Sequence, residues 1–154
     1  MDRAIEGFHQ DEGGDWVAEL RCGHGQHVRH RPPFWTVPWV LTAEGRASRL
    51  GLALPCVLCD RFELPAGFAP YKRTPVFDED VIPRGLLKDH STKAGVWGVI
   101  HVVKGRLRYI VEPPLARELA LDPARPGVVV PEVLHRVVAD GAVQFYVEFH
   151  RRAG

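Results

Sequence analysis

The chain has few cysteines, no surplus of either charge and no long apolar run, and each of these absences excludes a class of protein. Among its 154 residues, 20 Lys and Arg are balanced by 19 Asp and Glu, so no broad charge field attracts nucleic acid or an anionic membrane. No apolar stretch approaches the roughly 20 residues of a transmembrane helix, and the first residues lack the layout of a signal peptide. We therefore expect a cytoplasmic protein with no membrane partner.

All three cysteines belong to one pattern in the first part of the chain. Cys22 opens the segment CGHGQHVRH, in which His24 and His27 follow, and Cys56 and Cys59 form a C-x-x-C pair. Thiolates and imidazoles are the donors of tetrahedral zinc sites. Three cysteines cannot all form disulfides, and a turn-rich segment follows this C-x-x-C, unlike the helix that follows a thioredoxin-like redox pair. A structural zinc site is therefore the favoured interpretation.

The sequence leaves open which four residues complete this site. Cys56 and Cys59 need two further donors, and the first cluster offers one cysteine and several histidines. Cys22 is the favoured third ligand because a thiolate carries a charge that an imidazole lacks. His24 and His27 compete for the fourth position.

Basic and aromatic residues are interleaved in HVRHRPPFWTVPW, a combination that modules for single-stranded nucleic acid use. In the alternative reading, Trp35 and Trp39 form a small core beside the metal while Arg29 and Arg31 stay in solvent. Residues 1–61 contain 7 Lys and Arg against 8 Asp and Glu, so the positive field that such binding needs is absent. Nucleic-acid binding is therefore disfavoured.

The chain reads as a small zinc-binding α+β module over residues 1–61, followed by a mainly β domain over residues 62–154. RAIEGFHQ and DWVAELR, separated by DEGGD, predict a hairpin, and Thr42 and Gly51 bound a short predicted helix. The turn-rich segment LPAGFAPYKRT at 64–74 reads as the junction. Beyond it, runs such as VWGVIHVV and AVQFYVEFH predict short strands, with hairpin turns at residues 104–105 and 140–141.

The second part carries a series of landmarks in order: P-x-G-x-x-x-x-H-x-x-K at 83–93, a G-V-W run, P-E-x-x-H at 131–135, and a terminal Y-V-E-F. These residues resemble the small bacterial cupins called tellurite-resistance-like, a domain also found fused to tellurite-resistance methyltransferases. The resemblance implies a double-stranded β-helix barrel and a role in stress response. The first part resembles a short bacterial Cys/His-rich family of unknown function, which implies no activity.

The cupin resemblance also implies a metal at the mouth of the barrel, held by histidines and a carboxylate. The H-x-H of the first cupin motif is not intact in this sequence. What remains is His90 from the first half and His135 from the second, with Glu132 or Glu148 as the carboxylate. Two histidines and one carboxylate form the donor set of open sites that hold Zn, Fe or Mn. We expect such a metal site in the barrel.

Two functions from different classes remain open. The protein is either a metal-dependent barrel that binds or transforms a small anionic compound, attracted by Lys93 and Arg84, or a non-catalytic protein that sequesters a metal ion or an oxyanion such as tellurite. The zinc module would serve as a scaffold or contact a partner protein or nucleic acid. An open coordination position would separate catalysis from sequestration. Exposed sheet edges are also compatible with a homodimer.

Overall fold

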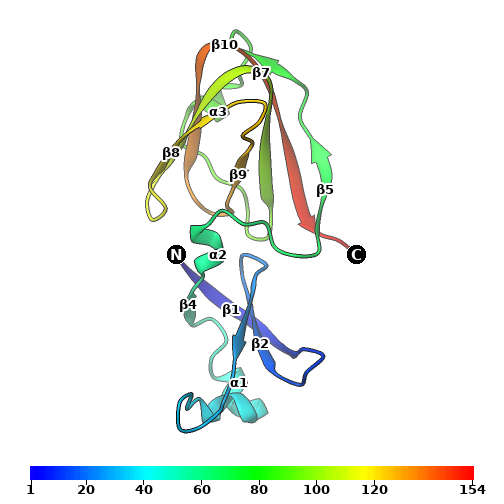
Figure 1. Ribbon diagram of the computed structural model, residues 1–154, viewed down its shortest axis with the longest axis vertical. Coiled ribbons are helices and arrows are strands. Elements are labelled where there is room, and N and C mark those ends of the chain that lie inside the picture. Colours follow the sequence, from blue (N-terminus) through cyan, green and yellow to red (C-terminus); the bar gives the residue numbers. More distant parts are fainter. The chain divides into compact units, whose positions relative to one another are not determined.

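The computed structural model describes all residues, Met1–Gly154, and is mainly β with a few short helices (Figure 1). Its contacts divide the chain into two compact units, Met1–Leu58 and Cys59–Gly154. The mainly β class expected from the short apolar runs is confirmed. A division between residues 61 and 62, and closure as a double-stranded β-helix, stay predictions. None of the helices has the length and apolarity needed to cross a membrane.

The first unit is built on an antiparallel sheet with the strand order β3-β2-β1-β4. Its strands are β1 (Asp2–Gln10), β2 (Trp16–Leu20), β3 (Gly25–Val28) and β4 (Ala53–Pro55), so the expected hairpin of β1 and β2 is present. A 3-10 helix, η1 (Pro38–Leu41), precedes α1 (Ala43–Ala47). The predicted cap of α1 forms, because the Thr42 hydroxyl oxygen accepts a hydrogen bond from the Gly45 N–H at 3.0 Å.

The apolar core of the first unit is small. Its buried members are a few aliphatic residues of the sheet and of η1, together with the cysteines: Ile5, Val17, Ala18, Leu20, Val40, Cys22 and Cys56. Trp39 packs edge-to-face on Phe8, with 5.9 Å between ring centroids, but Trp35 is exposed. A core of this size stabilises a unit of about 60 residues only marginally, so a metal cross-link would add what apolar burial does not supply.

The second unit is organised around two long antiparallel strands, β7 (Trp97–Val111) and β10 (His135–Arg152). The sheet order is β5-β10-β7-β8, and two short strands add to it, β6 on β10 and β9 on β7. The remaining elements are α2 (Val57–Asp60), which contains the division between the units, β5 (Phe68–Arg73), β6 (Phe77–Asp78), α3 (Arg84–Leu87), β8 (Arg117–Leu121) and β9 (Gly127–Val129). The largest fully buried side chains are Trp97, Tyr109 and Phe145.

Two expectations about this unit were wrong. The chain does not reverse at residues 104–105 or 140–141, because β7 and β10 run through these positions and their pairing register shifts there instead. Gly105 (φ 84°) and Gly141 (φ 76°) adopt the left-handed conformation, which bends a strand at a bulge as readily as it closes a turn. The junction expected at 64–74 contains β5, which pairs with the end of β10 despite its turn-forming residues.

Candidate metal centre and ligand cavity

Cys22, His24, Cys56 and Cys59 come together in the structure. Each offers one ligand atom, these four atoms lie within 4.8 Å of one another, and all four residues are buried. The three cysteines are free thiols. Two sulfurs bound to one tetrahedral zinc at 2.3 Å would lie about 3.8 Å apart, and the Sγ atoms of Cys22 and Cys56 are 3.9 Å apart. The cluster therefore has the donor set and spacing to hold a metal ion such as zinc.

The histidine of this cluster is His24. Its Nδ1 lies 3.4 Å from the sulfur of Cys22 and 3.4 Å from that of Cys56, close to the about 3.6 Å expected for nitrogen and sulfur on one tetrahedral zinc. Burial alone would lower the pKa of His24, but hydrogen bonds with the two sulfurs outweigh it and raise the pKa to about 9. Sulfur atoms that favour a cation at this position favour a metal ion by the same electrostatics.

The sheet of the first unit explains why residues so distant in sequence meet. β2 and β4 both pair antiparallel with β1, so their carboxyl ends lie at the same edge of the sheet. Cys22 and His24 lie in the tight turn after β2, where Gly23 (φ 100°) takes the left-handed conformation and its N–H donates to Leu20. Cys56 follows β4 directly, and Cys59 lies one helical turn further on in α2.

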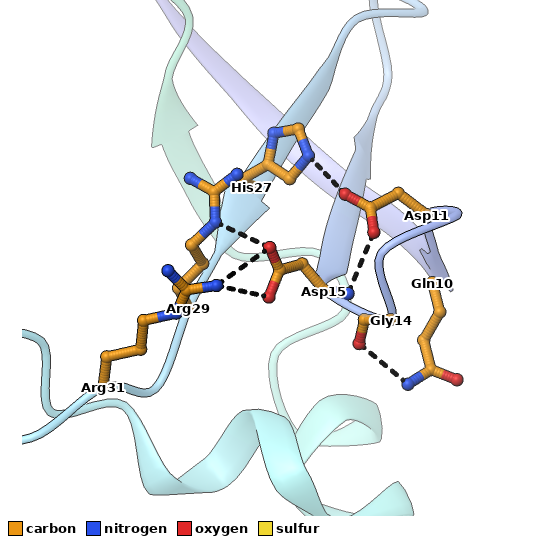
Figure 2. A network of polar contacts seen from close by, with 7 residues as sticks. All are labelled: Gln10, Asp11, Gly14, Asp15, His27, Arg29 and Arg31. Atoms are coloured by element: carbon orange, nitrogen blue, oxygen red, sulfur yellow. Dashed lines mark hydrogen bonds and ion pairs between the residues drawn. The ribbon is translucent and has the colours of Figure 1, made fainter.

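His27, the other candidate for the fourth position, does not lie in the cluster. It is on β3, and its Nε2 donates a hydrogen bond to Asp11 at 2.8 Å (Figure 2). This hydrogen bond and one from the Asp15 N–H lower the pKa of Asp11. His24 and His27 are only three residues apart. The turn between β2 and β3 places His24 beside the sulfurs, and the start of β3 carries His27 to Asp11.

The two arginines of the basic and aromatic segment are paired with an acid. Figure 2 shows Arg29 and Arg31 converging on Asp15, at 3.0 Å from Nε of Arg29 and 3.2 Å from the guanidinium of Arg31. These contacts lower the pKa of Asp15, with the hydrogen bond from Arg29 as the main cause. Asp15 balances part of the positive charge that contacts with phosphate groups would need.

The second unit contains a cavity of about 380 Å³ that lies beside β10. Its lining comes from β5, α3, residues 90–96, β7, β9 and β10: Tyr71, Lys72, Leu86, His90, Ser91, Thr92, Lys93, Val96, Ile100, Val129, His135, Val137, Phe145, Val147 and Phe149. Two lysines and two histidines are among these residues, and no carboxylate is. The charged side chains of the lining are therefore all basic, within a largely apolar wall.

His90 and His135, expected to act together, are neighbours. Their backbones exchange two hydrogen bonds, at 3.0 and 2.9 Å, and their ring centroids are 4.1 Å apart. Nδ1 of His90 donates to the carbonyl of Lys88, and Nδ1 of His135 donates to that of Val133. Because a carbonyl only accepts hydrogen bonds, Nδ1 carries a proton in both rings.

Neither glutamate expected beside these histidines lines the cavity. Glu148 alternates with Val147 and Phe149, which do line it, so Glu148 lies on the other face of β10. There it accepts hydrogen bonds from His150 at 2.8 Å and His101 at 3.4 Å. Partial burial would raise the pKa of Glu148, but these two hydrogen bonds outweigh it and lower the pKa.

Glu132 is exposed and takes a left-handed conformation (φ 62°) in the segment before β10. Cys22, His24, Cys56 and Cys59 form the one cluster of at least three metal-type donors in the structure, and it includes neither His90, His135 nor a glutamate. A metal held by His90, His135 and a glutamate therefore stays a prediction from the cupin resemblance.

The sequence reasoning missed Lys72 and Tyr71 as cavity residues, because it assigned residues 64–74 to the junction. The alternation of FAPYKR is interrupted by Pro70, and only its pairing with β10 reveals it as a strand. Lys93 and Arg84 were expected to attract an anion; Lys93 lines the cavity and Arg84 does not.

Comparison with known proteins matches the two parts of the chain separately. Residues 6–63 match a family described as a protein of unknown function, DUF3565, and residues 72–147 match the TehB-like domain. A 39-residue segment is 41% identical to the probable S-adenosyl-L-methionine-dependent methyltransferase TehB of Haemophilus influenzae, and covers 25% of this chain. The match spans only 14% of the length of that protein.

Solved structures agree with this assignment. The crystal structure of TehB from Haemophilus influenzae superimposes with a TM-score of 0.52 and 27% identity, over 56% of this chain and 32% of that one. A protein from E. coli strain K12 gives a TM-score of 0.52 at 20% identity, over 60% of this chain and 98% of that one, which supports the fold alone. The chain is thus similar to the DUF3565 family, of unknown function, over residues 6–63, and to the TehB-like domain over residues 72–147.

Proposed function

We propose that the cavity of the second unit binds a small anionic compound, and that the Cys/His cluster holds a metal ion, zinc, that stabilises the first unit. The observation that carries the ligand proposal is the charge of the cavity lining. Lys72 and Lys93 line the cavity together with His90 and His135, and no carboxylate does. Positive side chains at the mouth of a partly enclosed, apolar cavity attract an anion.

The TehB-like match covers residues 72–147, which include most of the cavity lining. It supports the expected role in stress response, with tellurite as one candidate anion. The double-stranded β-helix implied by the cupin resemblance is part of this proposal, with β5, β7, β9 and β10 contributing residues to the cavity. A cavity metal held by a glutamate is not part of the proposal, because neither Glu132 nor Glu148 lines the cavity.

The metal proposal is for a structural site. Four protein donors fill a tetrahedral zinc shell and leave no position for a substrate, and all four are buried here. Bound zinc would supply a cross-link between the turn after β2 and the segment after β4. Metal analysis of protein purified without chelator should find one zinc per chain, and none in the Cys56→Ser variant. A full equivalent of zinc in that variant would show that the cluster is not the metal site.

The ligand proposal can be tested by titrating the full chain with acetate while following the imidazole resonances of His90 and His135 by NMR. We expect saturable shifts at these two rings, at constant ionic strength. Replacing both Lys72 and Lys93 with Gln should weaken the effect by roughly tenfold or more, because hydrogen bonds to charged groups are lost. The matched control, Lys104→Gln, lies outside the cavity and should leave it unchanged. Equal binding by all three proteins would contradict the proposal.

A further inference from the structure

The cavity lining is divided by polarity and depth. Its buried wall is apolar except for His135, and consists of Ile100, Val129, Val137, Phe145 and Val147. Lys72 and Lys93, by contrast, are exposed and lie where the cavity meets solvent. A ligand that satisfies both regions needs a charged group at the rim and apolar surface within.

The volume of the cavity also favours a ligand that has apolar surface in addition to its charge. A water molecule takes up about 30 Å³ in the liquid, and a bare oxyanion such as tellurite or sulfate displaces only a few waters, on the order of 100 Å³. The cavity measures about 380 Å³. An inorganic oxyanion would leave most of the apolar wall in contact with water, so little of the available apolar burial would contribute to its binding.

The buried imidazole also disfavours an anionic group at depth. Because Nδ1 of His135 donates to Val133, Nε2 of the neutral ring presents a lone pair. Burial is the main reason that the pKa of His135 falls to about 4, so the ring is neutral at neutral pH. The hydroxyl of Thr92 already donates to the carbonyl of Val96, at 2.6 Å. The polar groups with free donors are therefore those of the rim.

We infer that the ligand of this cavity is an organic anion, a monocarboxylate with an aliphatic or aromatic body, whose carboxylate lies against Lys72 and Lys93 and whose body packs on the buried wall. This inference rests on the proposed anion binding and specifies the class of anion. It gives the TehB-like domain of this chain a ligand class different from the inorganic oxyanion that the resemblance implied.

The test compares acetate, butanoate and hexanoate by calorimetry on the unmodified full chain, together with tellurite, sulfate and the neutral hexanamide. The dissociation constant should fall by about fourfold for each methylene that becomes buried. Hexanamide should bind roughly tenfold more weakly than hexanoate, because it lacks the charge that the lysines recognise.

A substitution in the apolar wall distinguishes the wall's contribution to binding from that of the lysines at the rim. Val147→Thr is nearly isosteric and places a hydroxyl in the wall, so it should weaken hexanoate by about fivefold and leave acetate unchanged. The matched control is Val103→Thr, since Val103 is exposed on β7 and does not line the cavity. Acetate binding that survives in Val147→Thr also shows that this variant is folded.

The outcomes distinguish the two proposals. If tellurite, sulfate and acetate bind as tightly as hexanoate, the organic-anion inference is overturned while anion binding stands. If none of these anions binds, or if hexanamide equals hexanoate, the proposed anion binding itself fails. A regular gain in affinity with chain length, together with a weakening of every carboxylate on removing both lysines, would support both.

Discussion

The rings of His90 and His135 lie 4.1 Å apart, although the residues are distant in sequence, because their backbones form an antiparallel bridge at the start of β10. Two imidazolium charges at this separation repel each other, and the apolar wall around His135 disfavours even one. This pair therefore connects the ligand cavity to the pH dependence of the second unit.

The stability of the second unit should fall as the pH drops from about 6.5 towards 4. Burial lowers the pKa of His135 to about 4, and nearby His90 adds to the effect, while the hydrogen bond to Val133 opposes it. In this window the unfolded chain binds a proton that the folded unit does not, so acid favours unfolding, by at most roughly 3 kcal/mol. The stability is fully present above the unfolded pKa.

Urea unfolding, followed at the amides of β7 and β10 over this pH range, would measure the effect. The His135→Gln variant should lose the corresponding part of the pH dependence. His9→Gln, an exposed histidine of the first unit, should keep it. Equal pH dependence in His135→Gln and the parent protein would show that another group titrates.

Two histidines three residues apart should differ in their effect on zinc binding. His24→Asn removes a donor of the cluster, so zinc affinity should fall by more than the roughly 10–100-fold that loss of an outer-shell partner costs. His27→Asn removes only the hydrogen bond to Asp11 and should leave zinc affinity unchanged. Competition with a chromogenic chelator measures the zinc affinity of each variant. A larger loss of affinity in His27→Asn than in His24→Asn would show that His27 is the ligand.

Removing the metal should unfold the first unit alone. Its apolar core is small, whereas the core of the second unit buries Trp97, Tyr109, Phe145 and many aliphatic residues. Hydrogen exchange on the full chain with and without a zinc chelator would test this. Protection should be lost in β1 and β2 and kept in β7 and β10. Loss of protection in all four strands would mean that the units do not fold independently.

Two glycines of the long strands should tolerate alanine differently. Both have positive φ, so strain alone costs about 1–2 kcal/mol at either site. A Cβ at Gly105 would lie 2.1 Å from the carbonyl oxygen of Ala142, whereas a Cβ at Gly141 would meet nothing within 4 Å. Gly105→Ala should therefore cost about 3 kcal/mol or more, and Gly141→Ala only the strain. Thermal unfolding that gives equal losses would contradict the close backbone approach at Gly105.

Features that depend on neighbours in sequence followed from the sequence itself. Three features are local, because they depend on spacing, side-chain chemistry and strand propensity over a few residues. They are the joint place of Cys56 and Cys59 in the metal cluster, the helix cap at Thr42, and the mainly β class of the second part. The sequence also determined that Cys22 and a nearby histidine were the donors to consider.

Only the tertiary structure decided between His24 and His27, and between the two faces of β10. The turn after β2 brings His24 to the sulfurs and leaves His27 beside Asp11, and the alternation along β10 directs Val147 to the cavity and Glu148 away from it. Lys72 joined the cavity because β5 pairs with β10, across the sequence. Strand register is set by long-range pairing, and a shift of one residue exchanges the two faces of a strand, so no local pattern fixes which side chains meet.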